Sequence, residues 1–131
     1  MIDLLVSTQD AAFAALSAAV PPELAAVYQH VPEGAQPPFI VVGDIEAEAF
    51  GGKDGGLEQH VLEINYVYRG KKRRDLLAMM HAGREALDGQ SIAADGASFG
   101  DPVWTSSATG AADDGVTYGG SQTYEILVQP G

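Results

Sequence analysis

The chain has 131 residues, 46% of them hydrophobic, and its 18 acidic residues outweigh 7 basic ones to give a formal net charge of −11. This length and apolar content predict one domain, residues 1–131, with a real core. The acidic balance disfavours nonspecific binding to nucleic acid or anionic membranes, and the absence of cysteine excludes disulfides, thiolate catalysis and cysteine-based metal sites.

The first predicted element is an amphipathic helix near the N-terminus. Its larger side chains recur at spacings of three and four, at Leu5, Gln9, Phe13, Leu16 and Val20. The helix is capped at Ser7 or begins earlier, near Asp3. Two prolines end its apolar run before the length of a membrane span, and no basic flank of a signal peptide precedes it. We therefore expect a soluble protein with no membrane role.

Two strands are predicted next, over residues 39–50 and 57–69, on either side of a glycine-rich tip at residues 51–56. In the first strand, Phe39, Val41 and Ile45 share one parity. In the second, Leu62 and Ile64 face one way while polar residues face the other. Such alternation is typical of an antiparallel strand with one buried face.

After Gly70 the apolar period becomes helical from Leu76 to Leu87, and Asp88-Gly89 ends this helix. A third strand over residues 99–108 and a fourth over residues 116–129 follow, separated by an Asp-Asp-Gly turn. The order ββ-α-ββ predicts an α+β fold. Its sheet is expected to be mainly antiparallel and four-stranded, with the N-terminal and central helices packed on one face.

The segment Val27–Asp44 reads Val-Tyr-Gln-His-Val-Pro-Glu-Gly-Ala-Gln-Pro-Pro-Phe-Ile-Val-Val-Gly-Asp. This segment resembles a family of proteins from tailed bacteriophages and gene transfer agents. These are the tail-completion proteins, also called tail terminators or head–tail joining proteins. The resemblance continues in the tip Gly-Lys-Asp-Gly-Gly, the strand Glu-Gln-His-Val-Leu-Glu-Ile-Asn-Tyr-Val-Tyr-Arg and the closing Thr-Tyr-Glu-Ile-Leu-Val-Gln-Pro. The resemblance spans nearly the whole chain as a distributed pattern of strands and turns.

The resemblance implies a structural protein of the virion, made in the bacterial cytoplasm, and not an enzyme. Such proteins are expected to form a hexameric ring on the last ring of tail-tube subunits, to stop tube growth and to join the head–neck connector. DNA would pass through the channel without specific binding. Another ring component, such as a tube subunit or a head–tail connector, is the alternative, and a small ligand-binding domain is less favoured. An infectious phage, a prophage and a gene transfer agent all remain open as the source.

No catalytic, cofactor-binding or metal site is expected. The three histidines, His30, His60 and His81, have no second ligand at helical spacing, and no serine lies in a Gly-x-Ser-x-Gly motif. Only tertiary convergence could build a triad. Asp113-Asp114 lacks the spacing of a calcium loop and is interpreted as a solvated turn.

Five of the seven basic residues lie between Arg69 and Arg74, at the predicted start of a helix, where the macrodipole disfavours cations. The cluster is either a solvated helix end or the partner of an acidic surface on a neighbouring subunit; binding to DNA is a third, less favoured interpretation. The residues expected at a subunit interface are Lys71, Lys72, Arg73, Arg74, Glu46 and Glu48. The channel of the ring is expected to be negative or neutral, with Glu46, Glu48 and Asp54 as its candidate acids.

Overall fold

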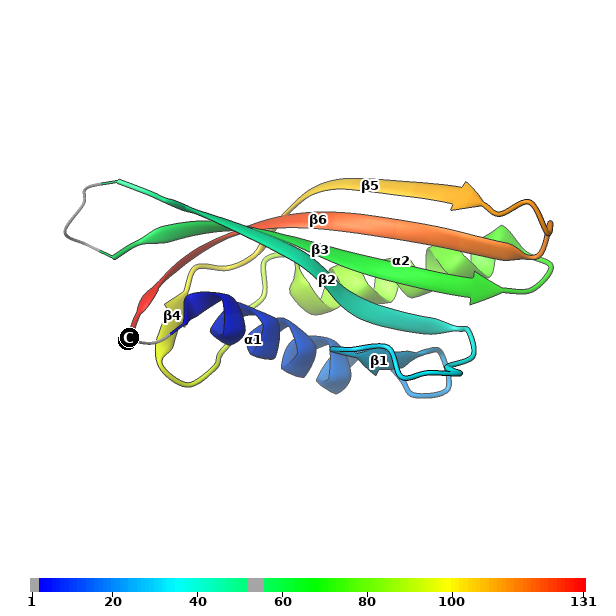
Figure 1. Cartoon of the computed structure of the whole chain (residues 1–131), viewed down its shortest axis with the longest axis horizontal. Coiled ribbons are helices and arrows are strands. Elements are labelled where there is room, and N and C mark those ends of the chain that lie inside the picture. The colour runs from blue at the N-terminus through cyan, green and yellow to red at the C-terminus, as the bar shows by residue number, and fades with distance from the viewer. Residues whose placement is uncertain (1–2, 52–55) are drawn as a thin grey trace.

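The computed structural model describes residues 3–51 and 56–131, so Asp54 and most of the glycine-rich tip lie outside the described residues. The described residues form two helices and six strands in an elongated arrangement (Figure 1). In chain order these elements are α1 (Leu4–Ala19), β1 (Ala26–Tyr28), β2 (Phe39–Ala49), β3 (Glu58–Arg69), α2 (Arg73–Leu87), β4 (Ala97–Phe99), β5 (Val103–Ala111) and β6 (Thr117–Pro130).

The α+β class is confirmed, but the four-stranded antiparallel sheet is wrong. The strands form one six-stranded mixed sheet in the order β1-β2-β3-β6-β4, and β5 pairs with β6 on the same edge as β4. β1 pairs in parallel with β2, and every other pairing is antiparallel. Both added strands, β1 and β4, have only three residues, which is too short for an alternation pattern to reveal them.

A bulge in β2 changes which of its residues face the core. The pairing with β3 shifts between Val42 and Ile45, which inserts one extra residue and reverses the parity of the strand. Ile40 and Val42 therefore point into the core together with Ile45. The predicted grouping of Phe39 and Val41 with Ile45 is wrong for this reason.

Both helices cover the same face of the sheet, and the core lies between them and the strands (Figure 1). The even-numbered residues of β3 and β6 face this side, and Leu62, Ile64 and Ile126 among them are fully buried. The opposite side, which we call the open face, carries the odd-numbered residues of these strands. On β3 these are Gln59, Val61, Glu63, Asn65, Val67 and Arg69.

The helix ends follow ordinary capping chemistry at α1. Asp3 is the N-cap, and its carboxylate accepts a hydrogen bond from the Leu5 amide at 2.9 Å, so the earlier of the two predicted starts is correct. α2 begins at Arg73, three residues before the first residue of its predicted period, Leu76, and ends at Leu87 as predicted. Among the described residues, neither α1 nor α2 is long and apolar enough to cross a membrane.

Candidate assembly surfaces

The basic cluster forms one end of the molecule, which we call the basic pole. It comprises Arg69, at the end of β3, and Lys71–Arg74, which lead into α2; all five side chains are exposed. The Arg73 guanidinium lies 5.4 Å from the centre of the Tyr118 ring, and Arg69 Nε donates to Thr117 Oγ1 at 3.4 Å. Arg69 and Arg73 are therefore held over the end of the sheet, at the start of α2.

The start of α2 does little to offset these charges. Lys72 occupies the N-cap position without a side-chain cap, and Asp75 is the only acid in the first turn. Asp75 is itself engaged by the hydroxyl of Tyr68, which donates to it at 2.8 Å. Within residues 3–51 and 56–131, no base of the pole forms an ion pair. Cations at a helix N-terminus oppose the macrodipole, so an external anionic surface would stabilise them.

The acids Glu46 and Glu48 lie at the other end of the sheet. They belong to the arm, which we define as residues 45–49 of β2 paired with residues 58–62 of β3; it reaches past the first turn of α1 (Figure 1). Glu48 pairs with Gln59, and the basic pole begins ten residues further along β3 at Arg69. At about 3.3 Å per residue, the two charged groups of one chain are roughly 33 Å apart. The structure does not bring them together within a chain.

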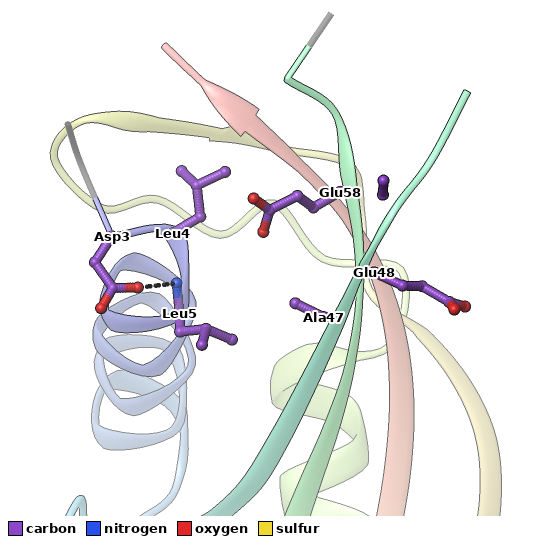
Figure 2. A pocket seen from close by; sticks show the side chains of 7 residues that line it. Asp3, Leu4, Leu5, Ala47, Glu48 and Glu58 are labelled. Atoms are coloured by element: carbon purple, nitrogen blue, oxygen red, sulfur yellow. Dashed lines mark hydrogen bonds between the residues drawn. The ribbon is translucent and has the colours of Figure 1, made fainter. Parts of the chain in front are cut away.

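An open groove of about 550 Å³ separates the arm from the start of α1. Figure 2 shows Glu58 on the side of the arm that faces α1, whereas Glu48 points away toward the open face. The groove is lined by Leu4, Leu5, Ala47 and Ala49, together with Asp3, Glu48 and Glu58. The charged residues of the groove are all acidic, so the groove is negative.

A hydroxyl, an imidazole and a carboxylate meet on the side of the arm that faces α1. Thr8 Oγ1 lies 2.7 Å from His60 Nδ1, and Glu58 Oε1 lies 2.8 Å from His60 Nε2. Thr8 and His60 are both 0% exposed, so no substrate can reach this hydroxyl. The contact is a buried link between α1 and β3. Along the strand His60 shares the parity of Leu62, but no sequence pattern indicates Thr8 as its partner.

The predicted turn at Asp113-Asp114 is held by Asp114. Its carboxylate accepts hydrogen bonds from the Thr117 hydroxyl and from the amides of Val116 and Thr117, and these bonds lower its pKa to about 2. The aspartate is thus committed to the β5–β6 turn. In the part of the chain that the structure describes, no group of three or more His, Asp or Glu residues could hold a metal ion.

Sequence reasoning also missed a contact that covers the start of β5. The Arg84 guanidinium stacks 3.7 Å above the centre of the Trp104 ring, and the Trp104 amide donates to Asp88 Oδ1 at 3.0 Å. These residues belong to α2 and β5, which meet only in the tertiary structure. The contact leaves the rest of β5 uncovered.

Known proteins share this architecture and sequence pattern. One chain in the structure of the virion of a native gene transfer agent particle has the same fold, with a TM-score of 0.86 and 19% identity over 98% of this chain and 99% of that one. No curated protein sequence matches. The sequence profile of the family described as tail completion protein gp17 matches residues 8–129. The chain therefore belongs to the tail completion protein gp17 family, as its sequence pattern predicts.

Proposed function

We propose that this protein closes the end of a phage-type tail as a ring of six identical copies. Membership in the tail-completion family gives it a structural role in a virion tail. In the proposed assembly one side of the ring contacts the tail-tube subunits and the other contacts the head–neck connector. The ring stops tube growth and joins tail to head.

The separation of charge along the chain is the observation that carries the proposal. Each copy has an acidic arm at one end and an exposed basic pole at the other, and about 33 Å of sheet separates them. Only a second copy can bring an arm against a pole. Such a contact uses two different surfaces, so it is heterologous, and heterologous contacts close into rings when the rotation between copies permits.

Net charge supports a channel that does not bind DNA. Six copies carry a formal charge of 6 × (−11) = −66. Glu46 and Glu48 pair with the open-face residues Val61 and Gln59, so they share the side of the sheet away from the helices. If the open face lines the channel, those of its acids that do not contact a neighbouring basic pole repel phosphate, and DNA passes without the salt-dependent binding that a basic lining would give.

Electron microscopy of assembled tails tests the proposal. We expect one six-fold ring of this protein between the tube and the neck. Tails assembled without the protein should show tubes of uncontrolled length that fail to join heads. A ring of another symmetry, or a position elsewhere in the particle, would contradict the proposal.

The alternative is another ring component, and self-assembly separates the two. A tube subunit polymerises without end when purified, whereas a terminator stops at a single ring or remains unassembled until a tube is present. Light scattering over a concentration series distinguishes these outcomes. Likeness to a chain of a gene transfer agent virion suggests that particle type as a source to test, through the genes adjacent to this one.

A further inference from the structure

We propose that neighbouring copies join edge to edge, with the free part of β5 pairing with the arm portion of β2 from the next copy. This inference deepens the proposed ring and rests on it, because it assigns the backbone segments that connect one copy to the next. Two strand segments, at opposite edges of the same sheet, have one side without a pairing strand among the described residues.

The first free edge belongs to β5. β5 pairs with β6 on one side, and its beginning is covered on the other by the hydrogen bond from the Trp104 amide to Asp88. A bulge between Trp104 and Ser106 follows. From Ser106 to Ala111 the strand reads Ser-Ser-Ala-Thr-Gly-Ala, and all six residues are exposed. No described strand pairs with their outer edge.

This edge lacks the features that normally protect a strand from pairing with another chain. Exposed edges in natural proteins are blunted by lysine, proline, a covering element or very short length. Residues 106–111 contain no charge and no proline, and their small side chains allow a partner backbone to approach closely. An exposed row of unpaired amide and carbonyl groups of this kind favours addition of a strand.

The second free edge belongs to β2. β1 pairs with β2 only at residues 39–41, ahead of the bulge. Beyond the bulge, residues 45–49 pair with β3 alone, and residues 46–49 are exposed. The arm thus offers a free edge of five residues, close in length to the six of β5.

The direction of the strands suits this pairing. Across the order β2-β3-β6-β5 each strand runs antiparallel to its neighbour, so β5 runs antiparallel to β2. A second copy placed with its arm beside β5 therefore continues the same antiparallel sheet, with its open face on the same side. The contact joins two different edges, as a closed ring requires.

The two free edges lie at different positions along the strand direction. This offset brings opposite charges of two neighbouring copies closer together. The free part of β5 is level with residues 63–68 of β3, whereas the free part of β2 is level with residues 58–62. Pairing them shifts one copy along the strands by about five residues, or roughly 17 Å. The shift carries Glu46 and Glu48 of the second copy toward the basic pole of the first.

Disulfide trapping tests the pairing, because the natural chain has no cysteine. Glu48 and Ala108 both project from the open face, whereas Thr109 projects from the helix-covered side. Tails assembled with the double variant Glu48→Cys/Ala108→Cys should give, after oxidation, a ladder of linked copies on a non-reducing gel. The matched control Glu48→Cys/Thr109→Cys should give at least five-fold less, because successive residues of a strand face opposite sides.

The exact register is scanned with Ser106→Cys and Gly110→Cys, each combined with Glu48→Cys. All of these positions are exposed, and the thermal unfolding of each variant is measured to confirm folding. If electron microscopy shows the ring but no open-face pair links above the Thr109 control, the edge pairing is wrong and the ring proposal stands. A link to a different tail protein instead of a second copy also overturns the pairing. Absence of any ring with the natural chain overturns the proposed function itself.

Discussion

Thr8 Oγ1 lies 2.7 Å from Nδ1 of His60, and this buried contact links helix α1 to strand β3. His60 in turn contacts Glu58, which lies further out along the arm. The arm's position relative to the helices therefore depends on a polar contact as well as on apolar packing. Any assembly contact that uses the arm benefits from this link, because it fixes the arm before a partner binds.

Replacing Thr8 with Val should destabilise the fold by about 1–3 kcal/mol, because it removes the partner of a fully buried imidazole nitrogen while conserving volume. The matched control is Ser17→Ala on the exposed face of the same helix, which should change stability by less than about 0.5 kcal/mol. Urea unfolding of both variants measures the difference. Equal stability of the two variants would show that the Thr8 contact contributes nothing.

Gln122→Leu should cost about 2–5 kcal/mol. The buried amide oxygen of Gln122 accepts hydrogen bonds from the hydroxyls of Tyr66 and Tyr124, and its nitrogen donates to the Met80 carbonyl at 3.0 Å. An apolar side chain leaves these buried groups without partners. Gln129→Leu, an exposed position of the same strand, is the control. A loss no larger than that of the control would contradict this account.

Gly83→Ala should destabilise the chain by about 1–3 kcal/mol despite the better helix propensity of alanine. A Cβ at position 83 would overlap the Tyr66 hydroxyl, and that hydroxyl is held in place by Gln122. Gly110→Ala meets no atom within 4 Å and serves as the control. Thermal unfolding of both variants is the measurement, and a stabilised Gly83 variant would show that Tyr66 can move aside.

Alkaline pH should weaken the fold through the same tyrosines. Burial raises the pKa of both Tyr66 and Tyr124 above the ordinary tyrosine value of 10.0. The unfolded chain then loses these protons first, so stability is fully present below about pH 10 and falls as the pH rises beyond it. Unfolding free energies measured between pH 8 and pH 11 should fall less steeply in the variant Tyr66→Phe than in the natural chain. Identical slopes would exclude this contribution of Tyr66.

Reversing Lys72, Arg73 and Arg74 to Glu should weaken ring assembly. The acids would lie at a helix N-terminus, where the macrodipole favours them, so folding should be retained. Single reversals should have small effects, because exposed ion pairs contribute little individually. The measurement is the fraction of tails that carry a ring.

Partial rescue should follow from Glu46→Lys and Glu48→Lys in the reversed chain. The control pair, Glu23→Lys with Glu33→Lys, changes the net charge by the same amount as the rescue pair, at exposed positions away from the arm. This control pair should not rescue assembly. Equal rescue by both pairs would mean that net charge alone matters. A structure of the assembled tail with the basic pole entirely in solvent would rule out the proposed contact.

Much of the local structure could be predicted from sequence. The alternation of β3, with Leu62 and Ile64 on one side, indicates a half-buried strand because side chains along a strand face alternate sides. The helical period from Leu76 to Leu87 gives α2 for a similar reason. The prediction failed at the β2 bulge, where one extra residue reverses the pattern, and at β1 and β4, which are too short to show one.

The amino-acid sequence predicts the α+β class and the family from a pattern of strands and turns along the chain, and it shows five bases between Arg69 and Arg74. The contact of Thr8 with His60, the separation of the arm from the basic pole and the free edges of β2 and β5 are seen in the tertiary structure alone. These relationships join segments that are distant in the chain. They depend on strand order and register, which the packing of the whole core selects and no local pattern encodes.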